Sequence, residues 1–269
     1  MIDLHTHILP GLDDGPADME EAVAMCRQAI SDGTTAVVAS PHMFNGMFDV
    51  GREDILDGVN RLRKRLEVES LSLAVSPGAD VHAVPNLDKL LRDGLAMTIG
   101  DGGKYIMTEL PQDTLPPGLS QLLFSLQLAG ITPIISHPER NMEVQANPFL
   151  MTDIVEAGNL IQLTAASVTG DFGEPPRECA RALITARLAH LVASDAHSPD
   201  RRPPGLSRAL AVVRKLLPTE EVKEMFFHRP RQVLAGEYID LPEWAGPELQ
   251  EKKRFAWTSR IRRGNRQFE

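Results

Sequence analysis

Two pairs of residues of the metal-ligand type stand far apart in this sequence. His5 and His7 are one residue apart in "MIDLHTHILP", and Asp195 and His197 repeat that spacing in "ASDAHSP". Residues two positions apart on a strand point to the same face, so each pair directs two side chains at one point. Mixed imidazole and carboxylate ligands favour zinc, manganese or iron over calcium and magnesium cages. The two pairs therefore predict a metal centre.

Further residues of the same types follow other short apolar runs. They are one of Asp13 and Asp14, His42, Asp80, Glu109 and His137. With the two pairs they make nine candidate ligands, whereas one ion in an open catalytic site takes three or four protein ligands. Nine ligands are too many for one ion and enough for three that share a bridging carboxylate.

A centre with several ions generates hydroxide at neutral pH and binds a tetrahedral oxyanion, which is the chemistry of phosphate-ester hydrolysis. Arg140 follows His137 in "SHPER", and Arg202 follows His197 in "HSPDRRPP". A guanidinium fork matches phosphate oxygens, so both arginines are candidate substrate-binding and catalytic residues. The "FNGMF" stretch after His42 is either an apolar lip at this site or an ordinary loop that packs its own side chains.

Three other histidines have weaker claims on the site. His82 follows Asp80 by two residues and either faces the site or lies outside it. His190 falls inside an apolar run and His228 in a helical segment, and we expect both to have structural roles.

Seven β-rich runs alternate with segments of helical periodicity. The runs cover residues 2–4, 35–39, 71–75, 105–108, 132–135, 160–163 and 188–193, and apolar residues at helical spacing occupy 19–30, 55–66 and 119–126. This alternation indicates an α/β fold with a parallel sheet, and seven units favour a closed barrel over an open doubly wound sheet. Six of the seven runs are followed by a histidine or carboxylate, and strand ends converge at the mouth of an α/β barrel.

Composition narrows the class of protein further. A net charge of −9 over 269 residues argues against a nucleic-acid surface over most of the chain. Only Cys26 and Cys179 are present, and we expect both to be buried thiols. The arginine expected six residues after a nucleophilic cysteine of a phosphatase is absent, since Asp32 and Thr185 occupy those positions.

The ends of the sequence bear on location and domain organisation. No apolar stretch approaches the roughly 20 residues of a membrane-spanning helix, and no basic-then-apolar leader precedes the first motif, so we expect a cytoplasmic protein. Residues 238–269 are basic and lack the α/β rhythm. We expect them to form a C-terminal extension to a domain of residues 1–237, either solvated or docked on an acidic partner or lipid surface.

The motifs resemble a known family when they are read in order. "DLHTHILPGLDDGP", "ASPHMFNGMF", "GADVH", "SHPER" and "ASDAHSPDRRPP" are similar to the PHP (polymerase and histidinol phosphatase) superfamily. Within it they resemble the CpsB/YwqE group of bacterial manganese-dependent protein-tyrosine phosphatases of capsule and exopolysaccharide synthesis. The resemblance runs from Met1 to Leu234 and implies a distorted TIM-like (β/α)7 barrel with three divalent metal ions, manganese first and iron or zinc as alternatives.

The resemblance also distributes the ligands. It implies a first ion held by His5, His7, Asp80 and Asp195, a second by Asp80, Glu109 and His137, and a third by Asp14, His42 and His197. It implies that Arg140 and Arg202 hold the substrate phosphate, and it leaves Asp13 to orient its loop. Asp80 stands where the group carries glutamate, so its bridging role is the one that the resemblance supports least.

The implied activity is hydrolysis of phosphotyrosine on a bacterial tyrosine kinase that regulates capsular or exopolysaccharide synthesis, through attack by a metal-activated hydroxide. One alternative is a PHP small-molecule phosphatase of the histidinol-phosphate type. Another is a non-catalytic regulator that binds phosphotyrosine, which the shorter Asp80 keeps open. The sequence leaves the oligomeric state undecided.

Overall fold

The computed structural model describes residues 1–241 of the chain. Its strands are all paired in parallel, in two sheets with the orders β1-β2-β4 and β3-β5-β6-β7-β8-β9. The strands are β1 (Ile2–Thr6), β2 (Ala36–Ala39), β3 (His42–Met43), β4 (Ala74–Pro77), β5 (Asp80–His82), β6 (Tyr105–Glu109), β7 (Thr132–Ser136), β8 (Leu160–Thr164) and β9 (Leu191–Ala193).

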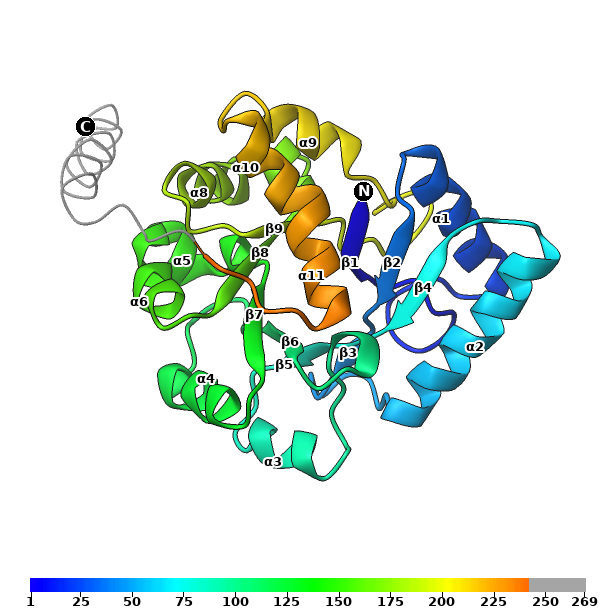
Figure 1. Ribbon diagram of the computed structural model, residues 1–269, viewed down its shortest axis with the longest axis horizontal. Coiled ribbons are helices and arrows are strands. Elements are labelled where there is room, and N and C mark those ends of the chain that lie inside the picture. The colour runs from blue at the N-terminus through cyan, green and yellow to red at the C-terminus, as the bar shows by residue number, and fades with distance from the viewer. Residues whose placement is uncertain (242–269) are drawn as a thin grey trace, which may run out of the picture. The chain divides into compact units, whose positions relative to one another are not determined.

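The two sheets form a single closed barrel (Figure 1). β2 runs on into β3 and β4 into β5 after two-residue interruptions, and β2 pairs with β4 as β3 pairs with β5. The other edge closes because Asp195 N donates to His5 O at 2.9 Å and His7 N donates to Ala196 O at 2.8 Å. Seven strand positions therefore surround the barrel, which confirms the predicted distorted (β/α)7 fold and excludes the open sheet.

Two predicted strands begin later than expected. The run at 71–75 is wrong in its first residues, because Leu71 N donates to Leu66 O and so completes the end of the preceding helix. Likewise Leu188 N donates to Leu183 O, and β9 begins only at Leu191. Apolar content alone does not separate a strand from the helix end that precedes it.

Helices surround the barrel (Figure 1). They are α1 (Met19–Ser31), α2 (Arg52–Val68), α3 (Leu87–Arg92), α4 (Leu119–Leu128), α5 (Met142–Ala146), α6 (Met151–Glu156), α7 (Ala165–Thr169), α8 (Glu174–Thr185), α9 (Ser207–Val213), α10 (Thr219–Lys223) and α11 (Arg229–Ala235), with single turns η1 (Ile99–Asp101), η2 (Pro138–Arg140), η3 (Pro148–Leu150) and η4 (Glu224–His228). The three periodic segments coincide with α1, α2 and α4, as predicted. Asp18 begins α1 by accepting hydrogen bonds from Glu20 N and Glu21 N.

The N-terminal ends of the strands are covered by the last helical segment. Tyr105, the first residue of β6, donates its hydroxyl to Glu237 O at 2.6 Å. Arg229 Nη1 donates to the carbonyl oxygen of His190 at 3.3 Å. Phe226, in the turn that precedes α11, is fully buried. This end of the barrel is therefore packed, and the opposite, C-terminal end is left to carry the site.

The two cysteines are free and buried, as expected. Burial raises the pKa of the Cys26 thiol to about 12 and raises that of Cys179 as well, so both stay protonated at neutral pH.

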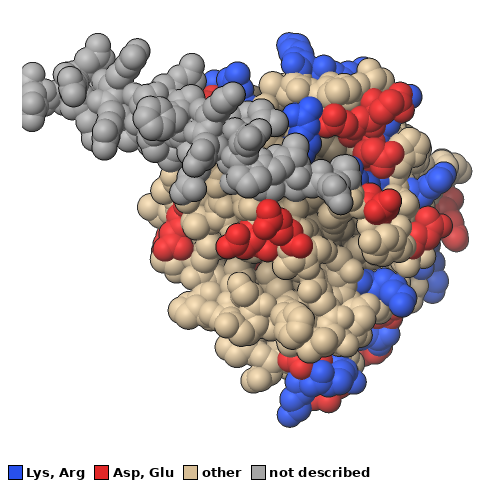
Figure 2. All heavy atoms as spheres, turned by 60° about the vertical axis from the view of Figure 1, so that its left-hand side comes forward, with Lys and Arg blue, Asp and Glu red and all other residues tan. Residues whose placement is uncertain are grey.

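In residues 1–241 no helix combines the length and the apolar character that crossing a membrane requires. In Figure 2 the charged side chains gather along the middle and the right-hand edge of the view, and the lower left of this face is largely without them. α4 exposes Phe124 and Leu128. Nearly all of the predicted extension, residues 238–269, lies outside the described residues.

Candidate metal centre

The barrel brings all nine predicted ligands together at its C-terminal mouth. Their ligand atoms form four overlapping groups, in each of which the atoms lie within 4.8 Å of one another. The groups are His7, Asp14, His42 and His197; His5, His7 and Asp80; His5, His137 and Asp195; and His42, Asp80 and Glu109. Because His5, His7, His42 and Asp80 each belong to two groups, the four groups make one continuous centre.

The β1 pair shows why this cluster suits a cation. Gln162 accepts a hydrogen bond from His5 Nδ1 at 2.9 Å, and Asp13 accepts one from His7 Nδ1 at 2.6 Å. With both Nδ1 atoms protonated, the two Nε2 atoms carry lone pairs, and they lie 3.1 Å apart. Burial lowers the pKa of both rings, that of His7 to about 4, so neither takes up a proton at neutral pH. Two lone pairs this close are stabilised by a shared cation.

The adjacent aspartates of the first motif have different places. Asp13 lies behind His7, where its Oδ2 also accepts from His42 N at 3.0 Å and its Oδ1 from Gly15 N at 3.0 Å. Burial works to raise the pKa of Asp13, but the His7 ring and these amides hold it well below its usual range. Gly15 is required here, because a Cβ at that position would lie 2.6 Å from the carbonyl oxygen of His7.

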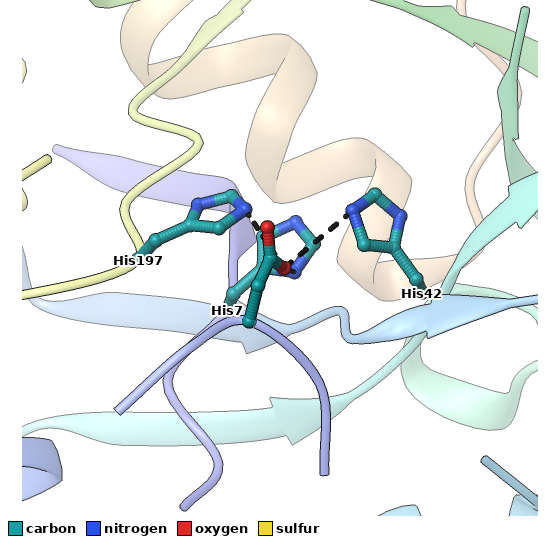
Figure 3. Close-up of side chains that lie close together, drawn as sticks. His7, His42 and His197 are labelled. Atoms are coloured by element: carbon teal, nitrogen blue, oxygen red, sulfur yellow. Dashed lines mark ion pairs between the residues drawn. The ribbon is translucent and has the colours of Figure 1, made fainter. Parts of the chain in front are cut away.

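Asp14 faces the centre instead. Its Oδ1 lies 3.4 Å from His197 Nε2 and 3.8 Å from His42 Nε2. Figure 3 shows His7, His42 and His197 converging from different parts of the barrel. The geometry gives Asp14 the position of a ligand and Asp13 that of a support for His7.

Asp80 presents a single oxygen to the centre. Its Oδ1 accepts a hydrogen bond from Ser136 Oγ at 2.8 Å. Its Oδ2 is buried with no hydrogen-bond partner among the described residues, 3.5 Å from both His5 Nε2 and His137 Nε2. A buried carboxylate oxygen without a donor is costly unless it meets a cation.

Backbone strain accompanies two of the ligands. His137 and Asp195 are buried and have φ angles of 32° and 53°, in the left-handed region that non-glycine residues seldom adopt. Each follows the end of its strand, at the turn into the next loop. Strain of this kind persists where surrounding contacts demand it and is concentrated at functional sites.

Glu109 lies close to two histidines, His42 and His82, at the other side of the mouth. Its Oε2 lies 3.3 Å from His42 Nδ1 and 3.5 Å from His82 Nδ1. Burial works to lower the pKa of His42, but Glu109 and Asp80 raise it to about 9. His82 therefore lies at the edge of the centre, as the first of its two sequence interpretations had it, although none of the four ligand groups includes it.

The two predicted arginines meet at Asp195. Arg140 Nη1 donates to Asp195 Oδ2 at 2.8 Å and Arg202 Nη2 donates to the same atom at 2.5 Å. The other oxygen, Oδ1, lies 3.5 Å from both His5 Nε2 and His7 Nε2. The Nε of Arg202 is buried and has no acceptor among the described residues. Asp195 thus joins the arginines to the histidines, and Arg202 keeps a donor available.

Three residues at the centre escaped the sequence interpretation. Gln162 lies on β8, the one predicted strand with no ligand after it, and Ser136 ends β7. Phe172 lies beneath both arginines, with its ring centroid 5.2 Å from Arg140 Cζ and 5.5 Å from Arg202 Cζ. Of these three, only Gln162 could have been found from the sequence, because it is a polar residue inside an apolar run.

His190 lies away from these contacts and has the structural role expected of it. Its Nδ1 accepts a hydrogen bond from Ile161 N at 3.0 Å, and burial lowers its pKa to about 3. The ring is therefore a neutral acceptor between β8 and β9.

The fold and the mouth together define a class of protein. In this parallel α/β barrel, histidines and carboxylates from the strand ends surround the facing Nε2 atoms of His5 and His7. This is the arrangement of a metal-dependent barrel hydrolase. The family model described as "Capsular polysaccharide synthesis, CpsB/CapC" matches residues 1–235. The chain belongs to this family, which confirms the resemblance seen in the motifs.

Individual relatives agree with the family match. The chain is 37% identical over 215 residues to the tyrosine-protein phosphatase YwqE of Bacillus subtilis, covering 80% of this chain and 84% of that one. It is 29% identical to the tyrosine-protein phosphatase CpsB of Streptococcus pneumoniae, covering 89% and 100%.

Solved structures show the same likeness. A crystal structure from work on YwqE and CpsB, described as unique metal-dependent tyrosine phosphatases, superposes with a TM-score of 0.86 at 34% identity, covering 89% of this chain and 96% of that one. A lactonase from Listeria monocytogenes, with a TM-score of 0.55 and 14% identity, shares the fold alone.

Proposed function

We propose that this protein is a metal-dependent phosphatase that hydrolyses phosphotyrosine in proteins. The observation that carries the proposal is the meeting of nine ligand-type side chains and two arginines at one barrel mouth. Membership of a family whose relatives are named tyrosine-protein phosphatases supports the choice of substrate. The same names give no support to a histidinol-phosphate phosphatase or to a non-catalytic binding protein.

The nine residues are proposed to hold three divalent ions, with manganese as the first candidate. His5, His7, Asp80 and Asp195 would hold one, Asp80, Glu109 and His137 the second, and Asp14, His42 and His197 the third. Bound ions would act as Lewis acids toward the phosphate and the attacking water. The Oδ2 of Asp80 has no hydrogen-bond partner among the described residues and lies 3.5 Å from two imidazole nitrogens, which supports a ligand role for Asp80 in the first and second of these sets.

Arg140 and Arg202 are proposed to bind the phosphate oxygens and to stabilise the charge that develops on them. Both reach the mouth from loops after strands, and both point at the same oxygen of Asp195. A phosphate beside Asp195 would receive charge-assisted hydrogen bonds from the two guanidinium groups. The buried Nε–H of Arg202 has no acceptor within residues 1–241 and could donate to it as well. A phenol, with a pKa near 10, leaves more readily than an alcohol, so a strong general acid is less necessary.

The protein substrate, the cellular location and the domain bounds are also part of this proposal. The substrate is proposed to be a bacterial tyrosine kinase of polysaccharide export, acted on in the cytoplasm. Residues 1–237 would be the PHP phosphatase domain and residues 238–269 a basic extension to it.

The activity is tested by phosphate release from phosphotyrosine peptides by the full chain loaded with manganese. His137→Ala is expected to abolish release and to lower the number of ions per chain, measured by elemental analysis. His228→Ala is the matched control, because His228 is exposed and outside the ligand groups.

Three results would contradict the proposal. Manganese-loaded protein without activity on the peptides would remove it, and unchanged release by His137→Ala would remove the assigned centre. Faster turnover of histidinol phosphate than of phosphotyrosine peptide would favour the small-molecule alternative.

A further inference from the structure

A pocket of about 390 Å³ adjoins the metal centre through Asp195. Its walls come from α7 and the loop that follows it, from the loop after β9, from the end of α1 and from α9. The lining combines Phe172 and Pro203 with charged side chains that include Asp32, Arg202 and Arg208. One oxygen of Asp195 faces the histidines and the other receives the arginines. Asp195 therefore separates the pocket from the histidines and lies next to the proposed phosphate position. The size of the pocket is that of a small-molecule site.

Phe172 is the aromatic wall of this pocket. Both guanidinium carbons lie within 5.5 Å of its ring centroid, inside the range of a cation–π contact. The side chain is half-buried, so part of the ring remains accessible. Phe172 thus lies next to both arginines and lines the pocket, where an aromatic group joined to a phosphate at the arginines could contact it.

The loop that carries Phe172 is held in place before any ligand binds. Gly170 N and Asp171 N both donate to Ala166 O, at 3.0 and 2.8 Å. Asp171 is bound in turn by Thr169 Oγ1 at 2.7 Å and by Arg208 at 3.0 and 3.1 Å. Gly170 has a φ of 92°, and a Cβ there would lie 2.8 Å from Arg177 Cδ, so the turn depends on glycine. A fixed loop gives the ring a fixed position, which favours selective binding.

Phe48 is a second aromatic side chain near the mouth, and it is less suited to this role. Phe48, from the "FNGMF" stretch, lies parallel to the His42 ring at a centroid distance of 6.2 Å and an interplanar angle of 3°. It also packs against the hydrophobic core. The contacts of Phe48 serve a candidate ligand, whereas those of Phe172 serve the two phosphate-binding candidates.

We propose that the pocket receives the aromatic leaving group of the substrate and that Phe172 determines selectivity for aryl over alkyl phosphates. This inference rests on the proposed function and adds the residue that distinguishes tyrosine esters from serine or sugar esters. Aromatic side chains gain from ring-on-ring contact beyond the area they bury, and an alkyl group gains nothing comparable.

The test measures binding, so that it does not depend on turnover. Inhibition constants, or dissociation constants by calorimetry, are compared for phenylphosphonate and methylphosphonate with the full chain loaded with manganese. In Phe172→Leu the constant for phenylphosphonate should rise about tenfold, while that for methylphosphonate stays within about twofold. Phe172→Tyr should retain the wild-type ratio, and Phe124→Leu, exposed on α4, is the control. Elemental analysis checks that each variant carries the wild-type number of ions.

Each other outcome has a defined meaning. Equal weakening of both phosphonates would overturn the inference, because Phe172 would then only support the arginines. Loss of the ratio in Phe48→Leu but not in Phe172→Leu would also overturn it. Wild-type preference for phenylphosphonate that Phe172→Leu removes, without hydrolysis of phosphotyrosine peptides, would uphold the pocket and reject the proposed function.

Discussion

Ser136 Oγ donates a 2.8 Å hydrogen bond to Asp80 Oδ1, and this bond decides which oxygen of Asp80 faces the metal centre. Both residues are fully buried. The other oxygen, Oδ2, points between His5 and His137 and has no donor among the described residues. Ser136 thus fixes the orientation of a carboxylate that has only one oxygen to offer.

Replacement of Ser136 by alanine should weaken metal binding without removing a ligand. Loss of a hydrogen bond behind a metal ligand commonly costs 10- to 100-fold in metal affinity. We expect Ser136→Ala to lose ions on dialysis against a weak chelator that leaves the wild-type protein loaded. Elemental analysis of the dialysed protein measures the effect.

Thr108→Val is the matched control for that experiment. Thr108 is also a fully buried hydroxyl residue at a strand end, but its Oγ1 has no hydrogen-bond partner among the described residues. The substitution preserves the shape of the side chain, so the ion content should not change. Equal ion content in Ser136→Ala and wild type would show that Asp80 keeps its orientation without Ser136.

Asp13 and Asp14 should respond differently to the same change. Asp14→Asn removes a charged candidate ligand from the group with His7, His42 and His197, so it should lose about one ion per chain. Asp13→Asn leaves that group intact and weakens the hydrogen bonds that Asp13 accepts from His7 Nδ1 and from two backbone amides, so it should keep the ion count with affinity lower by about tenfold. Titration of the metal-free protein with manganese, followed by calorimetry, gives both numbers. The reverse pattern would assign the ligand to Asp13.

The barrel was predictable because its signals are local. Alternation of apolar runs and helical periodicity lies within windows of a few residues, and α1, α2 and α4 were located from it. The starts of β4 and β9 were not, since hydrogen bonds from Leu71 and Leu188 back to the preceding helices decide them. A helix end and a strand start in one apolar run share the same side-chain pattern.

The centre was predictable for a different reason. Parallel strands in a barrel end at one mouth, so a histidine or carboxylate after each strand needs no further information to be placed there. Ser136, Gln162 and Phe172 carry residue types that are common everywhere, and their importance depends on contacts with Asp80, His5 and the arginines. Such contacts join positions 56 and 157 residues apart in the first two cases, beyond the reach of any local pattern.

Gln162 should control the tautomer of His5. Its Oε1 accepts from His5 Nδ1, while its own amide donates to Leu163 O at 2.7 Å, so the orientation of the amide is fixed. In Gln162→Leu the buried Nδ1–H loses its acceptor, which costs about 1–3 kcal/mol of unfolding free energy or moves the proton to Nε2. Nitrogen chemical shifts of His5 in the metal-free protein distinguish the tautomers. Unchanged shifts together with unchanged stability would exclude this role.

His190 should make the protein less stable as the pH falls below about 6.5, the ordinary pKa of histidine in an unfolded chain. Burial lowers its pKa in the folded protein to about 3, so between these values the unfolded chain binds a proton that the folded protein does not. The unfolding free energy therefore falls as the pH decreases through this window and does not change further below about 3. From pH 7 to pH 5 this contribution is about 2 kcal/mol.

Urea unfolding of the wild type and of His190→Asn at pH 7 and pH 5 measures that contribution. Asparagine keeps an acceptor for Ile161 N but does not titrate, so the variant should be less stable at pH 7 and yet lose about 2 kcal/mol less on acidification. Comparing the two losses cancels the titration of the nine candidate ligands, which both proteins share. His228→Asn, with an exposed ring, should lose as much as the wild type. Equal losses in His190→Asn and wild type would mean that the folded protein admits a proton on His190, and the hydrogen bond from Ile161 N to Nδ1 would then have to break at pH 5.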